Sequence, residues 1–399
     1  MQYIVKNNDL RVICNVKLLE NVQASKTAVL SSGGCCTVAL SKHLNGFITP
    51  ESLVKSGCAT IIVADNANES GSKMFQIPIS GNQMISFLDS DNRIVVLAVG
   101  KSNIQVAIST SPFSMGQDLV FEKRDDVFKS DFITEIDDVK YRRIPLDTGR
   151  YVDKILIADK NKKVYTLEYD STKSAFSNRR KIRSMEKVMG DDGLWAFYVS
   201  FVSENPEYTP ADFMYYNNAS NLCYTASDSI MTQDENHTDK NDMGFSHVNC
   251  IVPYGVYNGS KMQTESLLFA AAMKGNQRHR VYLQYAGFNT DVDDAIDNNP
   301  NADIYDISAL AANDRDVSFV CAIGEDGDNH NVLYTGVIPN DYYSYKKSGM
   351  VRELSPIYSG VSAVFPCQAS DDILTGFFVL DDATLVRFIY SLNSEIKKC

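Results

Sequence analysis

The sequence predicts an all-β protein, and three observations lead to this prediction. Short apolar runs recur along the 399-residue chain, and each is followed by a polar turn and an alternating run, as in two antiparallel strands joined by a turn. No segment sustains the 3.6-residue apolar period between capping residues that an amphipathic helix requires. Asn, Asp, Ser and Gly interrupt the chain every few residues, which is typical of strands joined by turns.

Residues 152–170 show the strand–turn–strand pattern most clearly. The apolar run at 155–158 ends at Asp159-Lys160-Asn161. From 164 to 169 the side chains then alternate, with Tyr165, Leu167 and Tyr169 on one side and Val164, Thr166 and Glu168 on the other. A continuous apolar run is typical of a strand with both faces buried, and alternation is typical of a half-buried strand. We therefore expect a β-hairpin here, with Asp159 as a turn residue.

The same hairpin pattern occurs seven times, at 58–79, 93–109, 152–170, 194–202 with 213–216, 267–285, 317–338 and 373–390. The first strands of these hairpins begin on average about 52 residues apart, and shorter β-rich pieces such as 132–136 and 361–365 lie between them. One hairpin and two shorter strands in about 50 residues match one four-stranded blade of a β-propeller.

We therefore predict a single irregular β-propeller over residues 1–399, with seven blades and no long helices. Rings of six or eight blades and a large β-sandwich assembly are the alternatives. The uneven spacing indicates loop insertions, and the polar stretches 217–245 and 286–303 are expected to be surface loops.

The N-terminal region offers a way to close the ring. Candidate strands at 11–19 and 35–41, within a region of about 11–41, precede the first hairpin. They could pair with the C-terminal blade at about 361–391, which would leave no free sheet edge.

Charge and composition limit the classes of function. The net charge of −12 and the pI near 4.9 disfavour a role that depends on neutralising phosphates, so nucleic acid is an unlikely partner. The N-terminus lacks the apolar stretch of a signal peptide, and no apolar run approaches the ~20 residues of a membrane helix. The nine cysteines include no Cys-x-x-Cys pair, which favours a reducing compartment, the cytoplasm or nucleus, with a virion as the alternative.

Motifs of known propeller families are missing from the sequence. The ring is expected to be WD40-like in architecture, but the single tryptophan, Trp195, precedes Ala196, and no Gly-His pair occurs. Only Gly33-Gly34 matches the paired glycines of kelch blades. The sequence therefore predicts the fold without indicating a family.

The sequence contains only weak signals for catalytic or metal-binding residues. Carboxylates after apolar strands could form the acid and base of a glycosidase, but turn residues explain them equally well; they are Asp65, Asp91, Asp159, Asp326 and Asp381. The segments 234–244 and 324–331 lack the closing Glu of a calcium loop, and the five histidines show no metal-ligand spacing. We expect no catalytic residue, no cofactor and no metal.

Two segments could bind a partner. The run 177–187 is basic on an acidic chain, and it could dock an acidic partner or be a solvated strand face; its cations are Arg179, Arg180, Lys181, Arg183 and Lys187. The polar stretch 340–349 holds Tyr342, Tyr343 and Tyr345, and exposed tyrosines are good interface anchors.

We expect a non-catalytic scaffold for protein–protein interaction that forms part of a larger complex. Dissimilar loops and the absence of a catalytic constellation both favour this role. One alternative is a viral or phage propeller that binds a receptor or glycan. A second is a carbohydrate-active, glycosidase-like enzyme.

Overall fold

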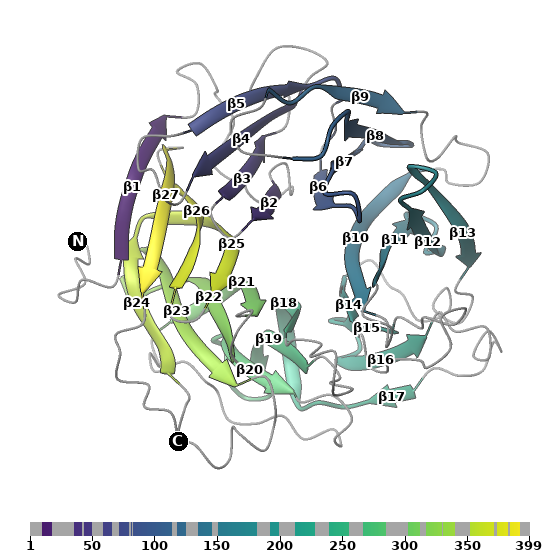
Figure 1. Cartoon of the computed structure of the whole chain (residues 1–399). Helices are drawn as coiled ribbons and strands as arrows, with labels where there is room; N and C mark the ends of the chain where they lie inside the picture. Colours follow the sequence, from purple (N-terminus) through teal and green to yellow (C-terminus); the bar gives the residue numbers. More distant parts are fainter. Residues whose placement is uncertain are drawn as a thin grey trace.

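Seven small antiparallel sheets form a ring in the part of the chain that the computed structural model describes (Figure 1). That part comprises residues 10–17, 36–41, 44–49, 59–65, 72–79, 81, 83–113, 118–124, 135–145, 151–181, 192–198, 212–227, 239–254, 266–284, 302–311, 317–328, 330–339, 352–370, 373–381 and 384–391. The predicted seven-bladed, all-β propeller is confirmed. No helix long and apolar enough to span a membrane is found in these residues.

The blades are numbered here along the chain, and their strands are given from the ring centre outwards. Blades 1 and 2 consist of β2 (Cys36–Ser41), β3 (Leu44–Thr49), β4 (Ala59–Asp65), β5 (Ser72–Ile77), and of β6 (Gln83–Leu88), β7 (Ile94–Val99), β8 (Ile104–Ser109), β9 (Phe121–Arg124). Blades 3 and 4 consist of β10 (Ile136–Pro145), β11 (Tyr151–Asp159), β12 (Val164–Asp170), β13 (Ala175–Lys181), and of β14 (Gly193–Tyr198), β15 (Asp212–Asn217), β16 (Leu222–Ser227), β17 (Asp239–Asn241).

The remaining blades follow the same order, except that blade 5 has three strands among the described residues. Blade 5 contains β18 (Phe245–Tyr254), β19 (Ser266–Met273) and β20 (Arg280–Gln284). Blades 6 and 7 consist of β21 (Asp303–Ala311), β22 (Val317–Glu325), β23 (Asn331–Pro339), β24 (Arg352–Ser359), and of β25 (Val361–Ser370), β26 (Ile373–Leu380), β27 (Thr384–Ser391), β1 (Leu10–Lys17).

The two ends of the chain meet in blade 7. β1 pairs antiparallel with β27, and the two strands lie side by side in Figure 1. The segment 36–41 does not join this blade, because it forms the innermost strand of blade 1. The N-terminal region expected to pair with the last blade is thus divided between two sheets.

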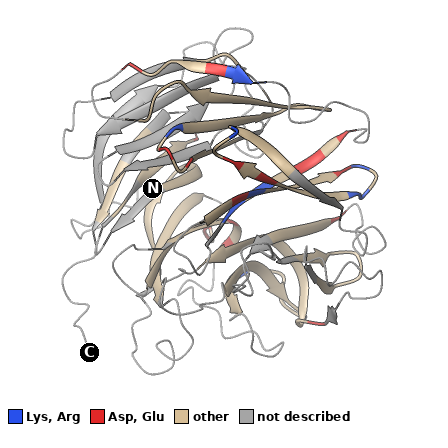
Figure 2. Cartoon of the chain, turned by 45° about the vertical axis from the view of Figure 1, so that its right-hand side comes forward, with Lys and Arg blue, Asp and Glu red and all other residues tan. Residues whose placement is uncertain are grey.

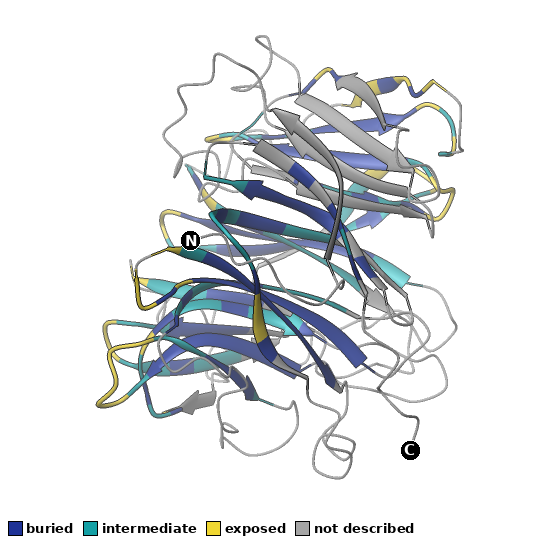
Figure 3. Ribbon diagram, turned by 90° about the vertical axis from the view of Figure 1, so that its left-hand side faces the viewer, coloured by how far each residue is buried: buried dark blue, intermediate teal, exposed yellow. Residues whose placement is uncertain are grey.

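The core lies between neighbouring blades, as the buried strands in Figure 3 show. All six residues of β7 are buried, and alternate side chains contact different hydrophobic clusters. Ile94, Val96 and Ala98 face a cluster that includes Ile77, whereas Val95, Leu97 and Val99 share a cluster with blade 3 residues such as Ile155. Because each buried Val or Ile contributes roughly 1.5–3 kcal/mol, a strand between two blades becomes apolar throughout, as the sequence pattern predicted.

The polar stretch 217–245 is not one surface loop, as we had expected. It contains β16 and β17 of blade 4, and Cys223 in β16 is only 1% exposed. Outer strands of a blade meet solvent on one side, so they carry polar residues and resemble loops in the sequence. Residues 285–301, which make up most of the other stretch, lie outside the described residues.

Four of the innermost strands begin with a β-bulge. A bulge adds one unpaired residue and redirects the side chains next to it. The register shifts lie between Ile136 and Asp138, Phe245 and His247, Ile304 and Asp306, and Val361 and Ala363. Asp138, His247 and Asp306 therefore occupy equivalent positions just after the bulge.

Main-chain hydrogen bonds, three within a blade and three between neighbouring blades, stiffen one face of the ring. We name it the turn face because it carries the turns between second and third strands. The starts of innermost strands bond to these turns. The main-chain bonds are Ile136 N to Lys101 O, Lys160 N to Glu135 O, Asn218 N to Asp192 O, Lys274 N to Gly244 O, Ile304 N to His279 O and Gly360 N to Asn331 O. The innermost strands of blades 3 to 7 thus all begin at this face.

Candidate functional site

The basic run predicted as a docking site lies partly on the rim of the ring. Arg180 and Lys181 pair with Thr166 and Tyr165 through the backbone of β13, the outermost strand of blade 3. The side chains of 178–181 lie outside the described residues, as do Arg183, Lys187 and the whole stretch 340–351 with its three tyrosines. Both docking sites stay predictions, and β13 is an exposed edge, where basic residues also prevent strand pairing with another chain.

The turn aspartates have a structural role in the described blades. Asp159 Oδ1 accepts the main-chain N–H of Lys163 at 2.8 Å, while the Asp159 N–H donates to the Lys163 carbonyl at 2.9 Å. Asp326 Oδ1 accepts the N–H groups of Asp328 and His330, both at 2.9 Å. Both carboxylates shape tight turns by accepting the N–H group four positions later, and Asp326 also accepts the one two positions later.

The same turn occurs in blade 2, but its carboxylate is Asp89 and not Asp91. Asp89 Oδ1 accepts the N–H groups of Asp91 at 2.9 Å and Arg93 at 2.8 Å. Asp91 is exposed and forms an ion pair with Arg93 at 3.3 Å. Asp381 accepts a hydrogen bond from the Asn331 side chain at 3.1 Å, and the side chain of Asp65 lies outside the described residues. The turn carboxylates therefore belong to separate blades.

One group of three candidate metal ligands is present in the described part of the chain: Asp326, Asp328 and His330, whose ligand atoms lie within 4.8 Å of one another. The Asp326 oxygen in this group already accepts two main-chain N–H groups. Asp89, with Arg93 in place of the histidine, builds the same turn. The geometry of the turn is sufficient to explain this group.

A cluster of ionisable groups at the ring axis was not predicted. Lys140 on β10 forms an ion pair with Asp138 at 3.0 Å and lies 5.1 Å from the centre of the Trp195 ring on β14. Cys250 Sγ on β18 lies 3.8 Å from Asp306 Oδ1 on β21. We name these five residues the axial cluster. Since β10 and β21 belong to blades 3 and 6, their charges interact across the ring centre (Figure 1).

Removal from water, which is only partial for the 41% exposed Lys140 side chain, shifts protonation in the axial cluster. It raises the pKa of Asp306 to about 6, although the Ile307 N–H, the Cys250 thiol and Lys140 favour the carboxylate. Burial, with the Asp306 charge, raises the pKa of Cys250 to about 12, so this thiol stays protonated. Burial alone would lower the pKa of Lys140, but the Asp138 carboxylate outweighs it and the pKa is raised. Groups with shifted pKa values that converge from several strands mark a candidate functional site.

One sequence feature could have indicated this cluster. Residues 138–142 alternate charged side chains with Val139 and Tyr141 within a strand that lines the ring centre. On the side of the ring that Figure 2 brings forward, acidic and basic residues lie on the same strands. Without knowing which strand is innermost, the sequence cannot place Asp138 and Lys140 opposite Asp306.

We expect Asp306→Asn to stabilise the protein at pH 8 and to have little effect at pH 4. The pKa of Asp306 is about 6 in the folded chain, against an ordinary value of 3.8. The unfolded chain therefore ionises first as pH rises, and the charge destabilises the fold by up to about 3 kcal/mol above pH 6. Thermal unfolding of wild type and variant across this range measures the effect.

Asp170→Asn is the control for this experiment, and its effect should have the opposite sign. The Thr172 hydroxyl and Lys173 lower the pKa of Asp170 to about 2, so its charge stabilises the fold above about pH 4. A stability of Asp306→Asn equal to that of wild type at pH 8 would contradict the assigned burial of this carboxylate.

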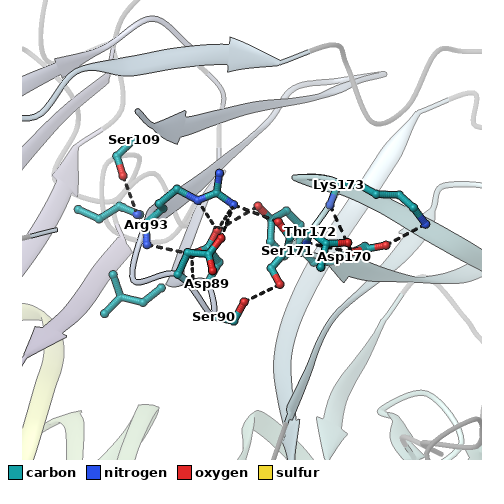
Figure 4. A network of polar contacts seen from close by, with 12 residues as sticks. Asp89, Ser90, Arg93, Ser109, Asp170, Ser171, Thr172 and Lys173 are labelled. Atoms are coloured by element: carbon teal, nitrogen blue, oxygen red, sulfur yellow. Dashed lines mark hydrogen bonds and ion pairs between the residues drawn. The ribbon is translucent and has the colours of Figure 1, made fainter. Parts of the chain in front are cut away.

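A second polar network joins blades 2 and 3 (Figure 4). Arg93 donates through Nε to Asp89 Oδ2 at 2.9 Å and through Nη2 to the Ser171 carbonyl of blade 3 at 3.0 Å. The Ser90 hydroxyl also donates to the Ser171 hydroxyl at 2.6 Å. Asp89 is 1% exposed and the Arg93 side chain is 19% exposed, so this network is a partly buried bridge between two blades and is suited to holding the ring rigid.

Comparison with known proteins identifies the fold and no closer relationship. No family model and no curated protein matches the chain. A structure of BBS1N in complex with ARL6DN resembles it with a TM-score of 0.52 and 9% identity, over 97% of this chain and 98% of that chain. A PL25 polysaccharide lyase, an ulvan lyase bound to a saccharide, resembles it with a TM-score of 0.52 and 10% identity, over 90% and 93% of the two chains. At such identities the similarity shows the β-propeller fold alone.

Proposed function

We propose that this chain is a non-catalytic propeller that binds other proteins as a subunit of a larger assembly. The observation that carries this proposal is how the chain uses its turn carboxylates. Asp89, Asp159 and Asp326 each accept main-chain N–H groups, in blades 2, 3 and 6. Carboxylates held in separate turns cannot act together across one glycosidic bond. Without a pair of carboxylates that can act together, the chain offers a stiff ring that presents loops, and such rings suit protein binding.

The chemistry of the described surface indicates how a partner would bind. Val120 is the one large apolar side chain that is exposed among the described residues. Recognition through the described surface would therefore depend on polar and charged contacts, which steer association and weaken with salt. The resemblance to BBS1N, which was solved in complex with another protein, supports a protein-binding role. We place the chain in the cytoplasm or nucleus, with a virion as the alternative.

We expect the double variant Arg179→Glu and Arg180→Glu to lose an acidic partner, because both positions lie on the rim strand β13. The measurement is quantitative mass spectrometry of the proteins that the tagged full chain captures from its native source at low salt. Recovery of the main partner should fall at least tenfold.

The matched control reverses Lys123 and Arg124, which are exposed on β9, the corresponding rim strand of blade 2. Its recovery of the partner should equal that of wild type. Equal recovery by the β13 variant would remove the basic run from the proposed docking surface.

A carbohydrate-binding or carbohydrate-active role is the second candidate, and the axial cluster favours it. Asp138 and Asp306 bring two carboxyl groups to the ring centre beside Lys140, and the ulvan lyase that resembles this chain was solved with a saccharide. Binding of acidic and neutral polysaccharides to wild type and Asp306→Asn tests this role. If wild type cleaves a polysaccharide and Asp306→Asn does not, an enzyme is favoured. If wild type binds a polysaccharide without cleaving it, an attachment propeller is favoured.

A further inference from the structure

Two histidine rings lie close together at the turn face of blade 5, with their planes at 75° to each other. His247 follows the bulge at the start of β18, and His279 ends the turn between β19 and β20. The distance from His247 Nδ1 to His279 Nε2 is 2.9 Å. Asp303, the first residue of β21 in blade 6, lies 2.8 Å from His279 Nδ1 through its Oδ1 atom.

Hydrogen bonding fixes the tautomer of His279. Asp303 Oδ1 accepts both the main-chain N–H of His279 at 2.8 Å and the ring Nδ1–H. A carboxylate can only accept, so the proton of neutral His279 lies on Nδ1 and the Nε2 lone pair points toward His247. One proton, carried by His247 Nδ1, then fills the space between the two rings.

We propose that His247 and His279 bind a divalent ion of the zinc, nickel and copper class at the position of this shared proton. Imidazole nitrogen is a preferred ligand of these ions, whereas magnesium and calcium prefer oxygen. Metal-binding histidines characteristically donate their second ring N–H to a carboxylate, and the contact from His279 to Asp303 has this form. The inference is independent of the proposed protein-binding role.

The geometry requires only a small movement. With Zn–N bonds of about 2.0–2.1 Å in a tetrahedral site, the two nitrogens would lie about 3.3–3.4 Å apart. The rings therefore need to separate by about 0.5 Å from their present distance. His247 is exposed, while the His279 side chain is 14% exposed and held by Asp303, so His247 can make the movement and water can fill the open positions.

Titration of the metal-free full chain with Zn²⁺, followed by calorimetry, tests the proposal. Wild type should bind one ion, and Zn²⁺ should raise Tm in a way that EDTA reverses. His247→Gln should weaken binding at least tenfold without unfolding the exposed site. Asp303→Asn should weaken it about 10–100-fold, because it removes the carboxylate behind His279.

His330→Gln is the matched control, because it alters the group formed by Asp326, Asp328 and His330 and leaves the proposed site intact. This variant should bind as wild type does. Co²⁺ in place of Zn²⁺ should give a spectrum without thiolate charge transfer, which excludes binding by cysteine. Unchanged affinity in His247→Gln, loss in His330→Gln, or a thiolate band would overturn the proposal.

Discussion

Replacing Lys154 with methionine is expected to cost about 3–5 kcal/mol of folding stability, because it leaves a buried charge without its partner. The Lys154 side chain is 0% exposed, and its Nζ atom lies 3.2 Å from Glu168 Oε1, which belongs to a side chain only 15% exposed. The two residues are directly opposite on β11 and β12. Urea unfolding of the variant measures the loss.

A second substitution separates the charge effect from the packing effect. When both members of a buried ion pair are replaced by apolar residues, the desolvation cost of both charges disappears. Lys154→Met combined with Glu168→Leu should therefore recover most of the lost stability. Lys173→Met is the exposed control, since its ion pair with Asp170 at 2.9 Å involves a side chain 72% exposed, and such pairs contribute little. A single Lys154 variant as stable as wild type would contradict the buried pair.

Asp89→Ala is expected to destabilise the protein by about 3 kcal/mol or more, because one side chain closes a turn and joins two blades. It accepts the N–H groups of Asp91 and Arg93, and it forms an ion pair with the Arg93 guanidinium at 2.8 Å. Removing it leaves Arg93, 19% exposed, with the Ser171 carbonyl of blade 3 and the exposed carboxylate of Asp91 as its polar contacts.

Chemical denaturation of Asp89→Ala beside Asp91→Asn measures this effect. Asp91 is 61% exposed and pairs with the same arginine at 3.3 Å, so its replacement should change stability little. Asp89→Asn keeps an acceptor oxygen and should fall between the two. Equal stabilities of the Asp89→Ala and Asp91→Asn variants would contradict the role assigned to Asp89 in both the turn and the bridge between blades.

A strand could be predicted from the sequence where neighbouring blades bury both of its faces and so make it apolar. β7 is apolar along its length and β11 is apolar over residues 155–158, so each is visible in the sequence together with the turn that follows it. Blade 4 differs: its predicted hairpin joins β14 to β15, the first and second strands, across a long connection. The short turn from β15 to β16 lies in the polar stretch 217–245, for which the sequence predicted a surface loop.

The contacts at the ring centre could not be predicted, because they join residues far apart in the sequence. Asp306 lies near Cys250 and Lys140 only after three blades are placed around one axis. The bulges that place Asp138, His247 and Asp306 at equivalent positions of three blades have no recognisable sequence pattern. Asp159 and Asp326, in contrast, have the turn role that their position after an apolar strand predicts, whereas in blade 2 Asp89 has this role instead of Asp91.

Native purification of the tagged full chain, with its mass measured by light scattering and its companions identified by mass spectrometry, tests the proposed function most directly. We predict that the chain elutes in a complex of fixed stoichiometry with at least one other protein. This complex should be weakened by salt, as expected for the polar described surface. A chain that elutes alone as a monomer at its native concentration, or one that cleaves a polysaccharide, would contradict the non-catalytic protein-binding role.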